Sequence, residues 1–291
     1  MTRPSRLRVA EVVRVALTSS VARFNANEPG LWTDRDPEAV HQARVATRRL
    51  RSDLGTLHEF VDAKWSTNLR AELRWLGAEL GGVRDVEVLH ARLTLHAALL
   101  PDSDASAASA VIRRLDRDAT AARADLLIAL RTPRYAQLHR ALYEAALSPR
   151  LDAAARARAA KALPDAVQPI WRRLRRAMND LGTVPSDAAL HEARIRAKRL
   201  RYAAELVEPV IGRPARDLAG AVTRVQEVLG EHQDAVIADS WLAKTAPECS
   251  PSEAYALGML AEIERSQSVR ARAALANAWD TARDRRIRAW M

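Results

Sequence analysis

The sequence predicts an all-α protein, and three observations support this fold class. Ala, Leu, Arg and Glu dominate the 291 residues, and these residues have high helix propensity. Only 10 glycines are present, and runs of β-branched residues are few. Apolar residues recur with helical periodicity between clear breakers, and no segment alternates as a strand would. With 48% hydrophobic residues, the chain has ample material for a buried core.

The periodic segments predict roughly eight long helices and a short connecting one. The expected ranges are 5–26, 37–61, 64–99, 105–131, 134–147, 152–181, 187–209, 213–246 and 252–288. Turn-forming residues separate several of them, at 27–30, 100–106, 148–152, 181–187 and 246–252. Asp36 and Ser186 are candidate N-caps of two of these helices.

Two basic strings repeat one pattern 150 residues apart. HQARVATRRLR spans 41–51, and HEARIRAKRLR spans 191–201. Downstream, LGGVRDV at 80–86 pairs with LGEHQDA at 229–235. An internal duplication of a four-helix unit is the simplest explanation. It predicts a first helical bundle over 1–149 and a second over 150–291.

Each basic string predicts a helix with one cationic and one apolar side. At about 100° per residue, the cations of the first string fall within about 80° of one another. A solvated helix face normally mixes acids with arginines, whereas the first stripe has no acid and the second meets none before Glu205. The stripes therefore favour an anion-binding surface over a solvated bundle face. Their members are His41, Arg44, Arg48 and Arg51 in the first copy, and His191, Arg194, Lys198 and Arg201 in the second.

The length of the first stripe favours an extended ligand. The stripe covers about 15 Å of helix axis, which suits several anionic groups in series. Small Ser52 and Gly55 continue it without blocking the backbone. On the next helix, a weaker second row shares a face: Arg70, Arg74, Gly77, Gly81 and Arg84. Arg196 falls near the apolar side of the second basic helix, where the pattern does not explain it.

The net charge of +10 and a pI of about 10.6 indicate an acidic partner, such as nucleic acid, an anionic membrane or a phosphate polymer. The arginine bias is also compatible with a GC-rich genome, so the placement of the charges counts for more than their total. A single cysteine, Cys249, excludes an internal disulfide framework and fits a reducing compartment. Glu11 and Arg14 interrupt the N-terminal apolar stretch, and no uncharged run is long enough to cross a bilayer. We expect a cytoplasmic protein without a membrane partner.

The motifs resemble those of the CHAD family, the conserved-histidine α-helical domain. Both His-x-x-Arg strings, their spacing and the two later Leu-Gly motifs match the family pattern, and the resemblance covers nearly the whole chain. It implies two four-helix bundles related by pseudo-twofold symmetry. It also implies that basic helices line a central groove or pore that binds inorganic polyphosphate, with the polyphosphate granule as an expected location.

Carried over residue by residue, the resemblance selects the same eight residues as the two stripes. Secondary candidates for the ligand are Arg49, Arg199, Arg74, Arg84 and Tyr202. Arg49 and Arg199 lie more than about 100° from the centre of each stripe, so we expect salt bridges or secondary contacts there. Asp85 and Asp234 are expected to orient neighbouring arginines. Because Arg84 corresponds to Gln233, an equal contact in both halves is not expected at that place.

Three other functions are alternatives. An enzyme of the CYTH-type triphosphatase class would need a β-rich tunnel and clustered carboxylates, neither of which the sequence contains. The histidines at 58, 90, 96, 139 and 232 form no metal-ligand pattern, so no catalytic residue, metal or cofactor is expected. Nucleic-acid binding lacks a recognisable motif, and the seven tryptophans are scattered singly. The third alternative is an accessory protein to a phosphate-polymer enzyme.

Overall fold

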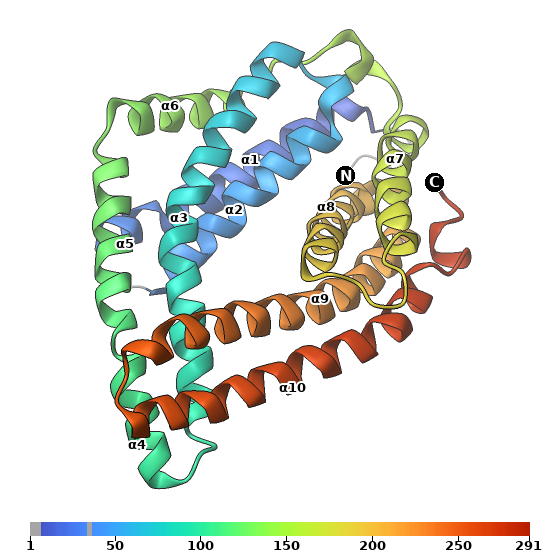
Figure 1. The fold of residues 1–291 in the computed structure, drawn as a ribbon. Coiled ribbons are helices and arrows are strands. Elements are labelled where there is room, and N and C mark those ends of the chain that lie inside the picture. The colour runs from blue at the N-terminus through green and yellow to red at the C-terminus, as the bar shows by residue number, and fades with distance from the viewer. Residues whose placement is uncertain (1–6, 34–36) are drawn as a thin grey trace.

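The computed structural model describes residues 7–33 and 37–291, and within these ranges it contains helices and no β-strand apart from two isolated bridges (Figure 1). The all-α prediction is confirmed. Short 3₁₀ turns connect several of the long helices. The helices are α1 (Val9–Asn27), α2 (Pro37–Thr56), α3 (Ala63–Ala97), α4 (Asp102–Ile112), α5 (Leu115–Leu130), α6 (Pro133–Leu147), α7 (Ala159–Asn179), α8 (Asp187–Ile211), α9 (Arg213–Thr245) and α10 (Pro251–Ala282).

The helix expected over 105–131 is wrong, because the chain breaks it into α4 and α5 at Arg113 and Arg114. The backbone N–H of Arg114 bonds to the carbonyl of Val111, a tighter turn than an α-helix makes. α4 buries Val111 against α9 and α10, whereas α5 buries Leu126 and Leu130 in a different core. One straight helix could not direct its apolar side to both.

Other helix ends agree with the sequence or differ locally. Ser186 caps α8, because its Oγ accepts a hydrogen bond from the backbone N–H of Ala189 at 3.3 Å. The expected cap Asp36 lies outside the described residues. The helix expected from 152 begins instead at Ala159, because Asp152 caps a separate 3₁₀ turn. α10 ends at Ala282, before the expected 288.

Buried side chains of both halves of the chain share two cores. The larger core includes residues from α1, α2 and α3 together with residues from α7, α8 and α9. The smaller core joins the ends of α3 and α4 to α9 and α10. Packing across the midpoint of the chain is therefore extensive, and the boundary at 149/150 stays a prediction, as does the internal duplication.

α2 and α8 carry the two basic strings, and the fold brings them into contact. α2 packs between α1 and α3, and α8 packs between α7 and α9. Both helices bury the alanine and leucine side that the sequence predicted, for example Leu50 and Leu54 on α2 and Leu200 on α8. The cationic side of each helix lies opposite its buried side. It is therefore free to face the space between the first and second halves of the chain. None of the described helices is both long and apolar enough to cross a membrane.

Candidate anion-binding site

Arg44 on α2 is held in place by two residues of α3. Its Nη1 donates to Oδ1 of Asp85 at 2.9 Å. Its guanidinium also lies against Gly81, where an added Cβ would stand 3.5 Å from Nη2. A Cβ there would make an ordinary van der Waals contact, whereas a side chain that extends beyond Cβ would displace the guanidinium. The absence of a longer side chain at Gly81 therefore leaves room for the arginine.

The second half repeats this arrangement with different elements. Arg194 on α8 lies 3.7 Å from Oδ1 of Asp234 on α9. A Cβ on Gly230 would stand 3.6 Å from Nε of the arginine. The expected pairing of both aspartates with neighbouring arginines is thus confirmed. The role of the glycines was missed, although the motifs carried a sign of it: each glycine precedes its aspartate by four residues, which places both on one helix face.

Cations from the two halves lie close enough to affect one another. The pKa of Lys198 on α8 is lowered to about 7 by burial first, and then by Arg194, Arg48 and Arg44. Arg48 and Arg44 belong to α2, so charges of the first half act on the second. Burial also lowers the pKa of Arg194; Asp234 opposes this effect, and Arg48 and Arg44 add to it.

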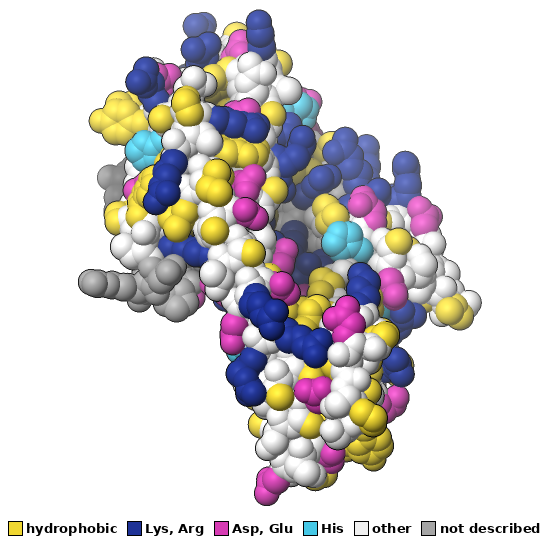
Figure 2. All heavy atoms as spheres, turned by 60° about the vertical axis from the view of Figure 1, so that its left-hand side comes forward, with side chains coloured by type: hydrophobic (Ala, Val, Ile, Leu, Met, Phe, Trp, Pro, Cys, Tyr) yellow, Lys and Arg dark blue, Asp and Glu magenta, His cyan; other side chains and the backbone are white. Residues whose placement is uncertain are grey.

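A second group of neighbouring arginines extends this set of interacting cations along α2 and α3. Burial lowers the pKa of Arg51, and Arg74, Arg199 and Arg70 lower it further. Arg199 belongs to α8, so it too faces cations of the first half. We call the whole set the cationic cluster: Arg44, Arg48, Arg51, Arg70, Arg74, Arg194, Lys198 and Arg199. The face in Figure 2 is hollowed, and Lys and Arg side chains gather around the hollow, with Asp and Glu also on its rim.

The cationic cluster is poorly neutralised. Among the residues that the structure describes, ion pairs reach only Arg44 and Arg194, through Asp85 and Asp234. The Nε atoms of Arg44, Arg48, Arg70 and Arg194 are buried without an acceptor. Buried donors and charges without partners cost free energy, which an anion placed among them would recover. The arrangement of the cluster favours an anionic ligand.

The two histidines of the stripes have different neighbours. Burial first, and then Arg84, lowers the pKa of His41, so this imidazole is disposed to be neutral when no anion is present. Nδ1 of His191 instead donates to Oε1 of Gln233 at 2.8 Å. Arg84 itself pairs with Glu87 at 3.1 Å. Positions 84 and 233 therefore have different partners in the two halves.

Arg201, Arg49 and Tyr202 form a separate network around Glu205. Arg49 pairs with the Glu205 carboxylate, as the expected salt bridge, and Arg201 approaches it at 3.6 Å. Both guanidiniums lie over the Tyr202 ring, 5.5 Å and 4.8 Å from its centroid. Tyr202 is 5% exposed, so it supports these arginines rather than offering itself to a ligand. Arg201 is therefore less available to a ligand than Arg51, its counterpart in the first stripe.

The neighbours of Arg199 and Arg196 differ from those that their positions on α8 indicated. Arg199 makes no salt bridge within the described ranges and belongs to the cationic cluster, although it lies off the stripe. Arg196 is explained by local partners. Its Nε pairs with Glu192 at 2.7 Å, and its Nη1 donates to the carbonyl of Arg173 on α7 at 3.1 Å.

Two histidines outside the stripes join helices. Nδ1 of His96 lies 2.7 Å from Oε1 of Glu264, and His232 contacts Asp187 at 3.1 Å and Ser268 at 2.8 Å. Within residues 7–33 and 37–291, no three His, Cys, Asp or Glu side chains are grouped to hold a metal ion.

Fold and site together define an all-α protein with a cationic cluster between two basic helices. The sequence profile of the CHAD domain matches residues 15–243, and the chain belongs to this family.

Two solved structures and two curated proteins resemble the chain. The structure titled "PptA from Streptomyces chartreusis" has a TM-score of 0.76 at 25% identity, covering 94% of this chain and 100% of the other. A CHAD domain from the plant Ricinus communis has a TM-score of 0.73 at 26% identity, covering 97% and 94%. The proteins MT2285 and Rv2226 of Mycobacterium tuberculosis, both named uncharacterized, are 33% identical over 252 residues. The match covers 81% of this chain and 46% of those relatives, so the chain spans about half their length.

Proposed function

We propose that the protein binds inorganic polyphosphate without catalysis, in a groove lined by the cationic cluster. The observation that carries the proposal is the convergence of cations from α2, α3 and α8 with few acids among them. Guanidinium groups donate paired hydrogen bonds to phosphate oxygens, and the buried Nε atoms offer further donors. His41 and His191 line the same stripes, and an anion among the cations favours the protonated, donating form of His41.

Polyphosphate suits the site better than a single phosphate. The basic stripe of α2 extends over about 15 Å, which is room for several phosphate groups in series. The resemblance to the CHAD family implies the same ligand, and membership of the family supports it. Association with polyphosphate granules follows if the groove holds one part of a long chain.

The experiment compares anions in a calorimetric titration. Long-chain polyphosphate is expected to bind with submicromolar affinity that falls steeply with salt, as expected when a polyanion releases its counterions. Orthophosphate and ATP are expected to bind much more weakly. Duplex DNA of matched charge that bound equally well or better would favour the nucleic-acid alternative instead.

The proposal that the site is non-catalytic has its own test. The two carboxylates that pair with members of the cationic cluster, Asp85 and Asp234, each lie against an arginine, so they serve to position cations. Pure protein with Mg²⁺ or Mn²⁺ is expected to release no orthophosphate from polyphosphate. Release that disappears when an acidic residue is replaced would contradict this.

Replacements of Gly81 should separate stability from binding. In Gly81→Ala, the new Cβ lies at an ordinary 3.5 Å from Arg44, so binding is kept and the helix gains about 0.5–1 kcal/mol. In Gly81→Leu, the larger side chain displaces the Arg44 guanidinium, so we expect roughly tenfold weaker binding. Calorimetry and chemical denaturation measure both effects. Equal binding by the two variants would show that the position of Arg44 does not matter.

Polyphosphate binding should depend on pH through Lys198. Its pKa of about 7 in the free protein rises when the polyanion binds, so binding takes up a proton above about pH 7. Affinity should therefore fall as pH rises, by up to about tenfold per pH unit from this residue. Lys198→Arg keeps the charge at every pH and should remove this part of the slope. Titrations between about pH 7 and pH 9 would contradict the assignment if both proteins had the same slope.

A further inference from the structure

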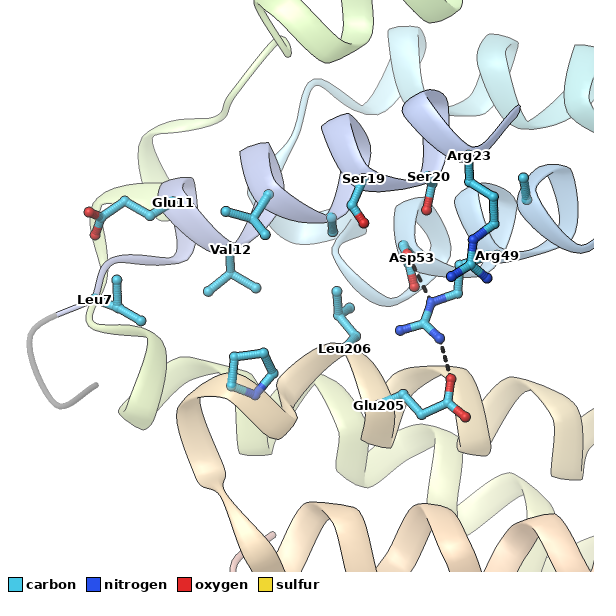
Figure 3. Close-up of a pocket in the computed structure, with 14 residues that line it drawn as sticks. Leu7, Glu11, Val12, Ser19, Ser20, Arg23, Arg49, Asp53, Glu205 and Leu206 are labelled. Carbon is cyan, nitrogen blue, oxygen red and sulfur yellow. Dashed lines mark hydrogen bonds and ion pairs between the residues drawn. The ribbon is translucent and has the colours of Figure 1, made fainter. Parts of the chain in front are cut away.

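A cavity of about 290 Å³ lies between α1, α2 and α8 (Figure 3). It is lined on α2 by Ala46, Arg49 and Asp53, which lie on a different face from Arg44, Arg48 and Arg51. The cavity is thus separate from the face of α2 that carries the cationic cluster. Its volume is near the size that small-molecule sites have.

The cavity has an apolar part and a polar end. Val12 and Leu206 face it from α1 and α8, and Arg23, Arg49, Asp53 and Glu205 lie together at one end (Figure 3). The apolar part is completed by Leu7, Val15, Ala16 and Pro209, and the polar end by Ser19 and Ser20. The remaining polar residue, Glu11, lies near the apolar end and accepts a hydrogen bond from the backbone N–H of Arg8 at 2.7 Å.

One cation at the polar end is not offset by an ion pair. Arg23 has no ion pair among the described residues, whereas Arg49 pairs with Glu205 and with Asp53. Burial raises the pKa of Asp53 to about 7, so this carboxyl is only partly ionised at neutral pH. One guanidinium is thus left to attract an anion.

Asp53 also has an unmet hydrogen-bonding requirement. Its side chain is 1% exposed, and its Oδ1 is buried without a partner. A buried polar atom without a hydrogen-bond partner destabilises the folded protein. When the carboxyl is protonated it can donate to an anion that Arg23 and Arg49 also hold.

We propose that this cavity binds a small amphiphile with a carboxylate head, of the type of a medium-chain monocarboxylate. The two oxygens of the carboxylate accept hydrogen bonds from Arg23, Arg49 and protonated Asp53. The alkyl chain lies along Val12, Ala16 and Leu206, where its burial removes apolar surface from water. This site is independent of the polyphosphate groove.

Calorimetric titration with decanoate below its micelle concentration tests the proposal. We expect one saturable site, with decanol and decylammonium binding at least tenfold more weakly because neither has an anionic head. Arg23→Gln should weaken decanoate binding at least tenfold. Arg14→Gln is the matched control, since Arg14 is an exposed arginine of the same helix that does not line the cavity, and it should have no effect.

A second variant tests the apolar part. Ala16→Phe should fill the cavity and abolish decanoate binding, while Arg48→Glu in the cationic cluster should leave it unchanged. Because Arg23 is exposed, Arg23→Gln folds normally and keeps the test valid if Ala16→Phe is unstable. The proposal is overturned by the absence of saturable decanoate binding, by binding that survives Arg23→Gln, or by tighter binding of decylammonium.

Discussion

Arg48→Glu and Lys198→Glu are each expected to weaken polyphosphate binding by about 2–4 kcal/mol, and the double variant by less than the sum. Arg48 and Lys198 come from different halves, yet each lies in the other's electrostatic field. One ligand chain that contacts both acts as a bivalent ligand with a high effective concentration. In addition, a glutamate at position 48 would offset one of the two nearby positive charges of Lys198 and Arg194. Loss of either residue therefore damages the same site.

Arg113 and Arg114 provide the control for this experiment. They lie at the break between α4 and α5, outside the cationic cluster. Reversing both changes the net charge by more than either single variant does, but it should cause only a small, salt-screened loss of affinity. Calorimetry at one fixed salt concentration measures all four variants. Simple additivity of the two single effects, together with an equal loss in the control, would indicate diffuse attraction to the surface.

Glu264→Ala is expected to lower the free energy of unfolding by about 3–5 kcal/mol. Glu264 on α10 is 0% exposed, and both of its oxygens are used. Oε2 accepts from Nε of Arg92 at 2.7 Å, and Oε1 lies 2.7 Å from Nδ1 of His96. The replacement would leave two buried polar groups of α3 without this acceptor. It would also remove a link between the two halves of the chain.

Glu231→Ala is the matched comparison for Glu264. Glu231 accepts from the same arginine at 2.7 Å, but its side chain is 44% exposed. Arg92 keeps Glu264 in this variant, so the expected loss is about 1 kcal/mol or less. Chemical denaturation measures both proteins. A loss for Glu264→Ala no larger than that for Glu231→Ala would show that burial of the network does not add to its strength.

Much of the fold follows from local sequence. Helical periodicity and turn residues located the long helices, because each helix buries one apolar side whatever its neighbours are. The break between α4 and α5 could not be found this way. It depends on Val111 entering one core and Leu126 another, and the division of the cores exists only in the folded chain.

The candidate anion-binding site could be predicted from the sequence to about the same extent as the fold. The two stripes follow from the repeated strings and from the helix angle alone. Arg201 approaches Glu205 four residues further along the same helix, and spacing alone indicates such a pair. The membership of Arg199 in the cationic cluster depends instead on how α2 meets α8. The spacing of residues within one helix carries no information on that contact. The polar end of the cavity behind α2 was not predicted for the same reason, since Arg23 and Glu205 meet only through the fold.

Hydrogen–deuterium exchange with and without one equivalent of polyphosphate tests the shared site most directly. We expect slower exchange in peptides covering 41–51 of α2 and 191–201 of α8, with both effects saturating together at one polyphosphate chain per protein. Slower exchange in one of these segments alone, or saturation of the two at different ratios, would contradict a single site formed by both halves.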